Sequence, residues 1–222
     1  MISLYISSFM VSVDAFHFGP IVIFSDVFTG KGNSTMPTNE FDPLNKEIFA
    51  GESVKWSNPT EGKPYPHTVT FIGNQSSEIK SKVSNITSEI QASDLQSLIT
   101  KLSEVKALKN GDNNITDQTF DGRSIIFPSV INSSDFQVTY LNASENKLYK
   151  GAQYNWTGNE QYLNSGLVWA GGVIPDGFPK INSFIVEFQE PGTYHYRCLI
   201  YPEMKGTITV KPNPGRLGIQ IQ

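Results

Sequence analysis

A change of hydrophobic period in the middle of the chain constrains its fold more than any other feature. Residues 41–72 alternate apolar and polar side chains between Gly- and Pro-rich turns, as strands do, and residues 184–212 show the same pattern. Between about 77 and 109 the apolar residues recur at spacings of three and four, as one face of a helix requires. Strands that flank a helical segment favour one enlarged Greek-key β-sandwich with a helical-hairpin insertion over two independent domains.

Two helices are predicted in this central segment. The first has an apolar face made of Ile79, Val83, Ile86 and Ile90. The second has an apolar face made of Leu95, Leu98, Leu102 and Val105. Ser93 is the predicted N-cap of the second helix. The remainder of residues 74–160 is predicted to form loops and short strands, among them 124–128 and 136–141, so we interpret 74–160 as an insertion.

Charge and composition argue against several classes of protein. The chain has 17 basic and 21 acidic residues, a net charge of -4 and a pI near 5.4, so it offers no broad basic surface for a nucleic acid. No stretch of about 18 apolar residues occurs, so no membrane-spanning helix is expected. The carboxylates show no paired spacing and there is no nucleophile elbow, so the sequence does not indicate an enzyme.

Seven Asn-X-Ser/Thr sequons indicate a glycosylated, exported protein. They lie at Asn33, Asn74, Asn85, Asn114, Asn132, Asn142 and Asn155. Residues 1–15 read either as a secretion signal, apolar from Ile2 to Val13, or as a first strand of the domain. We therefore predict an extracellular or cell-surface location on the outer face of a membrane, with one domain over 16–211 and a tail at 212–222.

The chain contains a single cysteine, Cys198, which excludes an internal disulfide bond. An unpaired thiol in an oxidising compartment is prone to oxidation unless it is buried or bound to a metal. Cys198 is therefore the first candidate for a functional residue.

Two segments carry a recognisable pattern around this cysteine. Residues 51–58 read Gly-Glu-Ser-Val-Lys-Trp-Ser-Asn, and residues 66–71 continue with Pro-His-Thr-Val-Thr-Phe. Residues 191–210 contain Gly-Thr-Tyr-His-Tyr-Arg-Cys followed by Tyr-Pro-Glu-Met-Lys-Gly, and Asn-Ser-Gly-Leu stands before them at 164–167. These segments resemble the signatures of the cupredoxins, the plastocyanin and azurin superfamily of copper proteins. The most similar variety is the secreted archaeal and bacterial one.

The resemblance implies a Greek-key β-sandwich and a single copper ion. A blue-copper site uses two imidazoles and a thiolate in a plane, with a weak thioether above it. Carried over to this sequence, His67 would be the distant imidazole, Cys198 the thiolate and Met204 the axial thioether. Tyr201 occupies the position of the second imidazole, and a neutral phenol with a pKa near 10 is a poor copper ligand.

This departure leaves three alternatives for the site. The domain has lost copper and kept the fold, with Tyr201 filling the space between loops. It binds Cu(I) through His67, Cys198 and Met204, or binds Cu(II) in an altered centre completed by Tyr201, Glu203, water or another histidine. The third alternative is a ligand supplied by another chain.

The two other histidines are poorer candidates. In a strand that ends at Cys198, His195 points away from the face that holds the cysteine and is predicted to lie on the surface. His17 stands between two aromatic residues and is predicted to be a half-exposed strand residue.

Three functional hypotheses follow. The first is an exported cupredoxin-like copper-binding protein for electron transfer to a redox protein or for copper handling. The second is a degenerate, metal-free cupredoxin that serves as a structural or interaction module of a cell-surface or membrane-associated assembly. The third is a copper enzyme with an open coordination position. Tyr201 is the residue that separates them.

Overall fold

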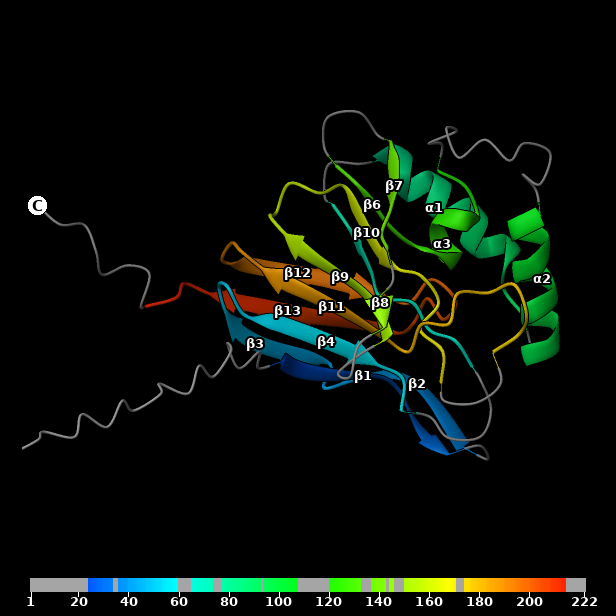
Figure 1. The fold of residues 1–222 in the computed structure, drawn as a ribbon, viewed down its shortest axis with the longest axis horizontal. Coiled ribbons are helices and arrows are strands. Elements are labelled where there is room, and N and C mark those ends of the chain that lie inside the picture. Colours follow the sequence, from blue (N-terminus) through cyan, green and yellow to red (C-terminus); the bar gives the residue numbers. More distant parts are fainter. Residues whose placement is uncertain are drawn as a thin grey trace, which may run out of the picture.

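The computed structural model describes the greater part of the chain. The described residues are 24–33, 36–59, 65–73, 77–92, 94–107, 120–132, 137–142, 144–145, 150–170 and 174–214. The predicted signal at 1–15 and His17 lie outside them. Two β-sheets face each other, and helices cover one end of the pair (Figure 1).

The first sheet combines three strands from about the first quarter of the chain with three from its second half. Its strands are β1 (Phe24–Asn33), β2 (Met36–Asp42), β4 (Ser53–Ser57), β8 (Ser144–Glu145), β9 (Lys150–Trp156) and β11 (Ser183–Phe188). They lie in the order β2-β1-β4-β11-β9-β8. β4 pairs in parallel with β1 and antiparallel with β11, which itself pairs in parallel with β9.

The second sheet carries the strands that flank the predicted site. Its strands are β3 (Asn45–Phe49), β5 (Thr70–Ile72), β6 (Pro128–Ile131), β7 (Val138–Tyr140), β10 (Tyr162–Ser165), β12 (Gly192–Arg197) and β13 (Lys205–Lys211). They lie in the order β3-β13-β12-β5-β10-β6-β7. Along the chain β4, β5, β11 and β12 alternate between the two sheets, as in Greek-key sandwiches, and this confirms the predicted fold class.

Aromatic side chains fill the space between the sheets. Alternation in β4 turns Val54 and Trp56 inward, and both are fully buried. The Trp56 ring centroid lies 5.8 Å from that of Phe71 in β5 and 5.3 Å from that of Tyr196 in β12, both edge-on. Each such pair adds about 0.5–1.5 kcal/mol to the gain from burial. The core thus fixes β4, β5 and β12 relative to one another.

The two predicted helices are present as α1 (Ser77–Glu89) and α2 (Leu95–Ala107). Most of the predicted apolar faces are buried: Ile79 and Val83 in α1, Ile90 just after it, and Leu98 and Leu102 in α2. The predicted N-cap Ser93 lies outside the described residues. The side chain of Asp94 accepts the Ser97 N–H at 2.9 Å and serves this purpose for α2. Both helices lie at one end of the sandwich (Figure 1).

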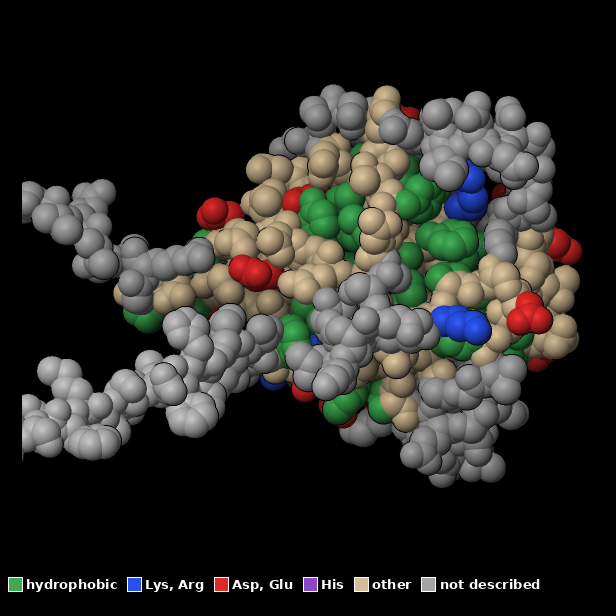
Figure 2. Space-filling view, viewed as in Figure 1, with side chains coloured by type: hydrophobic (Ala, Val, Ile, Leu, Met, Phe, Trp, Pro, Cys, Tyr) green, Lys and Arg blue, Asp and Glu red, His purple; other side chains and the backbone are tan. Residues whose placement is uncertain are grey.

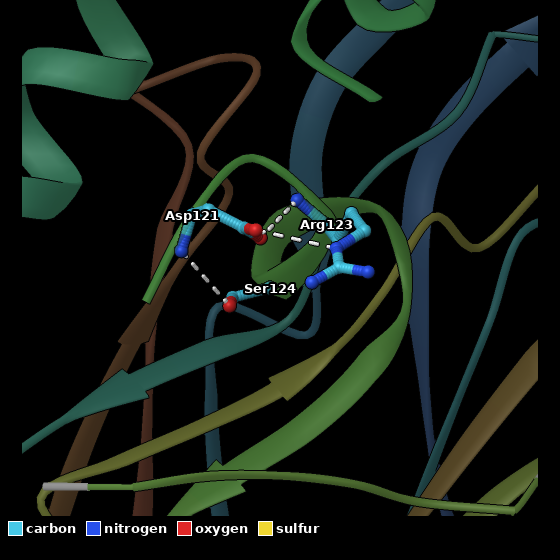
Figure 3. A network of polar contacts seen from close by, with 3 residues as sticks. All are labelled: Asp121, Arg123 and Ser124. Atoms are coloured by element: carbon cyan, nitrogen blue, oxygen red, sulfur yellow. Dashed lines mark hydrogen bonds and ion pairs between the residues drawn. The ribbon is translucent and has the colours of Figure 1, made fainter. Parts of the chain in front are cut away.

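The predicted strand at 124–128 is wrong. Arg123–Ile126 forms a short helix, α3, and the strand β6 begins only at Pro128. The Asp121 carboxylate accepts the backbone N–H of Arg123 at 2.8 Å and pairs with its Nε at 3.2 Å, while the Asp121 N–H donates to Ser124 Oγ (Figure 3). This local network holds the turn in a helical conformation, which the apolar run 124–128 does not reveal.

Within residues 41–72, which the alternation predicts to form strands, the last strand is shorter than the pattern indicates. β5 begins at Thr70, and His67 makes an isolated antiparallel bridge to Val168. None of the helices in the described segments is long and apolar enough to cross a membrane. On the face shown in Figure 2, hydrophobic side chains gather over β7, β9 and α3, and charged side chains of both signs are scattered around them.

Candidate metal centre

The predicted ligands come from two segments that meet at the end of the second sheet. His67 and Thr68 precede β5, and Cys198 begins the loop between β12 and β13. The Thr68 N–H donates to Cys198 Sγ at 3.3 Å, and the Leu199 N–H donates to Thr68 Oγ1 at 2.8 Å. These two bonds, each spanning more than a hundred residues of sequence, hold the cysteine beside the histidine segment.

The loop that carries Cys198 is closed by its own backbone. The Cys198 N–H donates to the Met204 carbonyl at 3.0 Å, and the Met204 N–H donates to the Tyr201 carbonyl at 2.9 Å. Cys198 and Met204 are both buried, whereas Tyr201 is half-buried. The turn thus brings the backbones of Cys198, Tyr201 and Met204 close together.

His67 is anchored from the neighbouring loops. The His67 N–H donates to the Val168 carbonyl at 3.1 Å, and the Val168 N–H donates to the His67 carbonyl at 2.8 Å. Asn58 Nδ2 donates to the carbonyl oxygens of Val168 and Tyr65, at 3.2 Å and 2.8 Å. Asn58 therefore ties the end of β4 to both sides of the histidine.

The imidazole of His67 has an unused nitrogen. The ring is 2% exposed, and its Nδ1 has no hydrogen-bond partner among the described residues. Burial lowers the pKa of His67 to about 3, so the ring is neutral at physiological pH. A metal requires neutral imidazole, and an unpartnered buried polar atom costs about 1–3 kcal/mol. The side chain is thus in the protonation state of a ligand.

Tyr201 packs against this imidazole. The two ring centroids are 5.2 Å apart, with their planes inclined at 49°. Burial, together with the nearby Cys198, Tyr65 and Glu203, raises the pKa of the Tyr201 phenol well above its ordinary value of 10. The phenol is therefore protonated, which makes it a poor ligand for either oxidation state of copper.

The Cys198 thiol is neutral in the metal-free protein. Burial raises its pKa, although hydrogen bonds from the backbone at Thr68, Tyr201 and Ile200 oppose part of that effect. A soft cation that binds the sulfur must therefore displace a proton, and the same donors would then stabilise the thiolate.

The helical insertion covers the loop that holds these groups. Gln91 Nε2, just after α1, donates to the Ile200 carbonyl at 3.3 Å. A cavity of about 200 Å³ lies between Leu98 of the insertion and Tyr201 of the loop. The insertion thus lies against the outer side of the candidate centre.

The structure therefore brings His67, Cys198, Tyr201 and Met204 to one end of the sandwich. His195 lies on the exposed side of β12, as predicted, where its Nδ1 lies 3.1 Å from Thr207 Oγ1. In the described part of the chain, no group of three or more His, Cys, Asp and Glu side chains could hold a metal ion. The predicted ligand set contributes only one histidine and one cysteine to such a group.

Sequence reasoning missed the supporting residues. Thr68 was part of the recognised segment, but nothing in the sequence indicated that its amide and hydroxyl would contact the cysteine loop. A series of hydrogen bonds extends from the neighbouring strand β5. Thr70 Oγ1 donates to Asn164 Oδ1 at 2.8 Å, and Asn164 Nδ2 donates to the Ser124 carbonyl at 2.9 Å. All of these groups lie in adjacent strands or loops that the sequence separates widely.

The donor set fits a copper ion in its chemistry. A neutral imidazole with a free nitrogen, a buried thiol and a thioether form a soft set of the kind that Cu(I) prefers. The protonated phenol of Tyr201 does not replace the second imidazole of a blue-copper site. The residues therefore fit Cu(I) better than an ordinary blue centre.

Comparisons with known proteins gave matches only among solved structures. No family model and no curated protein matches the chain. The chain is similar to an auracyanin from Roseiflexus castenholzii (14% identity, 84% of this chain and 95% of that chain, TM-score 0.33). It is also similar to a plastocyanin from Dryopteris crassirhizoma (16% identity, 84% of this chain and 100% of that chain, TM-score 0.32). A third similar structure is a purple cupredoxin from Nitrosopumilus maritimus (15% identity, 84% of this chain and 99% of that chain, TM-score 0.32). All these TM-scores are low, so the fold assignment rests on the strand order and register given above.

Proposed function

We propose that this chain is an exported cupredoxin-like protein that binds a single copper ion through His67, Cys198 and Met204. The soft donor set favours Cu(I), so the proposed role is copper handling, with electron transfer to a redox protein as the related use of the same site. The observation that carries the proposal is the buried Nδ1 of His67, which lacks a hydrogen-bond partner among the described residues. A bound copper ion would supply one-electron redox chemistry.

The residues around the ligands have definable tasks. The bridge to Val168 fixes the His67 backbone, and Asn58 holds that bridge in place. The Thr68 N–H, already 3.3 Å from Cys198 Sγ, would remain bonded to the thiolate and lower its basicity. Burial of the Cys198 side chain excludes water from the sulfur, which protects it from oxidation.

Other buried nitrogens without partners do not have the same meaning. The indole Nε1 atoms of Trp56, Trp156 and Trp169 are also buried without a hydrogen-bond partner among the described residues. An indole N–H is a donor only and has no lone pair to give to a metal. The imidazole of His67 does have one, and it lies at the end of the sandwich that also holds the buried thiol.

One observation favours a second candidate function. The Tyr201 ring packs on the His67 ring, with centroids 5.2 Å apart, and Tyr201 stands in the sequence where the resemblance to cupredoxins implies the second imidazole. A domain that had lost its metal would fill the vacated space in this manner. The alternative is therefore a metal-free structural or interaction module of a cell-surface or membrane-associated assembly.

Copper titration separates the two candidates. Protein purified under reducing conditions is titrated with Cu(I) against a competing chelator, and we expect one Cu(I) per chain. Cys198→Ser and His67→Leu should abolish binding, whereas His195→Ala, which removes the exposed imidazole of β12, should leave it unchanged. A wild-type protein that folds but takes up no Cu(I) would establish the metal-free alternative.

Tyr201 provides a second test of the pocket. Tyr201→His would supply the missing imidazole, and after oxidation this variant should show intense thiolate-to-copper absorption in the visible spectrum. Tyr201→Phe is the matched control, because it keeps the ring and supplies no nitrogen. A colourless Tyr201→His protein with bound copper would mean that the loop geometry does not approach that of a blue site.

Export is the other part of the proposal. Side-chain exposure is described for four of the sequon asparagines, and all four are exposed, as an attached glycan requires: Asn85, Asn132, Asn142 and Asn155. Treatment of the protein from its native cells with an endoglycosidase should lower its mass. An unchanged mass that equals the sequence mass would count against glycosylation.

A further inference from the structure

A second cavity lies on the outer face of the second sheet, and its lining residues Arg197 and Lys205 directly adjoin Cys198 and Met204 in the sequence. Its volume is about 690 Å³, which falls within the range of small-molecule sites. Its floor is formed by β5, β12 and β13, and its wall by α1 and the turn before β3. The lining residues used below are Leu44, Ile72, Lys80, Arg197 and Lys205.

The charge of this cavity is opposite to that of the chain. The chain has a net charge of -4, yet Lys80, Arg197 and Lys205 line the cavity and no carboxylate is among the described lining residues. His195 of β12 adds an imidazole to the floor of the cavity. A recess lined by one sign of charge concentrates counter-ions of the other sign. The cavity therefore attracts anions.

Two of these cations stand in an unfavourable arrangement. Arg197 on β12 is directly opposite Lys205 on β13 in the antiparallel register. Like charges in directly opposed positions destabilise a sheet. In addition, Arg197 Nε is buried and has no hydrogen-bond partner among the described residues. Both features cost stability in the free protein, and an anion bound between the two side chains would remove both costs.

Apolar groups lie beside the cations. Leu44 is 54% exposed and is one of only three large hydrophobic residues classed as exposed in the described part of the chain. Ile72 contributes a second apolar surface to the same cavity. A simple inorganic ion would leave Leu44 in water, whereas a ligand with an apolar body would cover it.

We propose that this cavity binds a small organic anion, with its carboxylate or phosphate head between Arg197 and Lys205 and its apolar body against Leu44 and Ile72. The guanidinium of Arg197 presents planar donors suited to such a head group. None of the residues that define the cavity is a proposed copper ligand. The inference is therefore independent of copper binding.

The test uses the fluorescent probe 8-anilinonaphthalene-1-sulfonate, an organic anion that becomes bright in apolar surroundings. We expect saturable binding of one probe per chain. Arg197→Gln/Lys205→Gln should weaken it at least ~10-fold, because a charge-assisted hydrogen bond contributes about that much. Lys82→Gln is the matched control. Lys82 is on α1, like the lining residue Lys80, but it is not a lining residue and pairs with Glu78 at 2.9 Å. Its affinity should equal that of the wild type.

Displacement of the probe by other anions distinguishes the head groups, and the melting temperatures of the variants show whether they fold. Octanoate, hexyl phosphate and inorganic phosphate are added in turn, and either organic anion should displace the probe at far lower concentration than phosphate does. The double variant should melt at or above the wild-type temperature, since it removes the opposed cations. Lys205→Gln alone provides a milder change if the double variant does not fold. Absence of probe binding, or equal binding in the wild type and in folded Arg197 and Lys205 variants, would overturn the proposal.

Discussion

The structure contains two buried polar groups that are treated in opposite ways. Glu160, 4% exposed, is surrounded by donors: its carboxylate accepts from the Thr157 N–H, from Thr157 Oγ1, from the Gly158 N–H and from the Tyr154 hydroxyl, all within 2.9–3.2 Å. His67, 2% exposed, has a ring nitrogen that none of the described residues contacts through a hydrogen bond. The fold satisfies the buried Glu160 carboxylate completely, and the contrasting unpartnered nitrogen of His67 is the observation on which the proposed copper site rests.

The hydrogen bonds of Glu160 indicate a structural role and the proposal assigns His67 a binding role, and four predictions test that division. Glu160→Ala should have the largest effect on stability, because it leaves at least three donors without their acceptor. The free energy of unfolding, measured with urea, should fall by about 2–4 kcal/mol. Affinity for Cu(I) should be unchanged.

The control for that prediction is Glu190→Ala, which removes the same charge from an exposed position. Its unfolding free energy should stay within about 0.5 kcal/mol of the wild type. If Glu160→Ala is as stable as Glu190→Ala, the buried carboxylate is not the structural group that its hydrogen bonds indicate.

The second prediction concerns stabilisation by the metal. At a free Cu(I) concentration one hundred times the dissociation constant, the unfolding free energy should rise by about 2.7 kcal/mol. His67→Leu, which keeps a side chain of similar size, should show no rise with Cu(I). Urea unfolding under anaerobic, reducing conditions measures both. A variant that gains as much stability as the wild type would show that copper binds elsewhere.

The third prediction is the pH dependence of the metal-free protein. The pKa of His67 is lowered from 6.5 to about 3 in the folded state, so between these values the unfolded state binds more protons. Stability must therefore fall as the pH falls through this window. From pH 7 to pH 5 the loss due to His67 should be about 2 kcal/mol. His67→Leu should lack this component, and identical pH profiles for the two proteins would contradict the burial of a neutral ring.

The smallest effect is expected for Thr68, which positions the cysteine loop. Thr68→Val removes the acceptor of the Leu199 N–H but keeps the shape of the side chain. We expect a loss of about 1 kcal/mol in stability and a ~10-fold weaker Cu(I) affinity. Thr193→Val, at an exposed position of β12, is the control. A change in stability with no change in affinity would make Thr68 purely structural.

The sequence predicted those features that depend on local periodicity. Alternation in β4 placed Val54 and Trp56 in the core, and the helical spacing in α1 identified Ile79 and Val83 as buried. The strand prediction for residues 124–128 failed because the hydrogen bonds of one carboxylate, Asp121, outweigh the apolar pattern that follows it. Periodicity describes the average environment of a segment and does not register a single hydrogen-bonding side chain.

The candidate site was predictable only as a set of residues. The resemblance identified His67, Cys198 and Met204 and also the unusual Tyr201. That Tyr201 packs on the His67 ring, and that Thr68 holds the thiol, depends on contacts across about 130 residues of sequence. The cationic cavity was not predicted, because it arises from the register of β12 against β13 and from the placement of α1 over their outer face.

The most direct test of the central claim is X-ray absorption at the copper edge of the Cu(I)-loaded protein. We expect one imidazole nitrogen, from His67, and two sulfur scatterers, from Cys198 and Met204, around copper. No phenol oxygen should contribute. The sulfur contribution should fall in Cys198→Ser, and the imidazole contribution should vanish in His67→Leu. A spectrum that shows only oxygen and nitrogen ligands in the wild-type protein would contradict the proposed site.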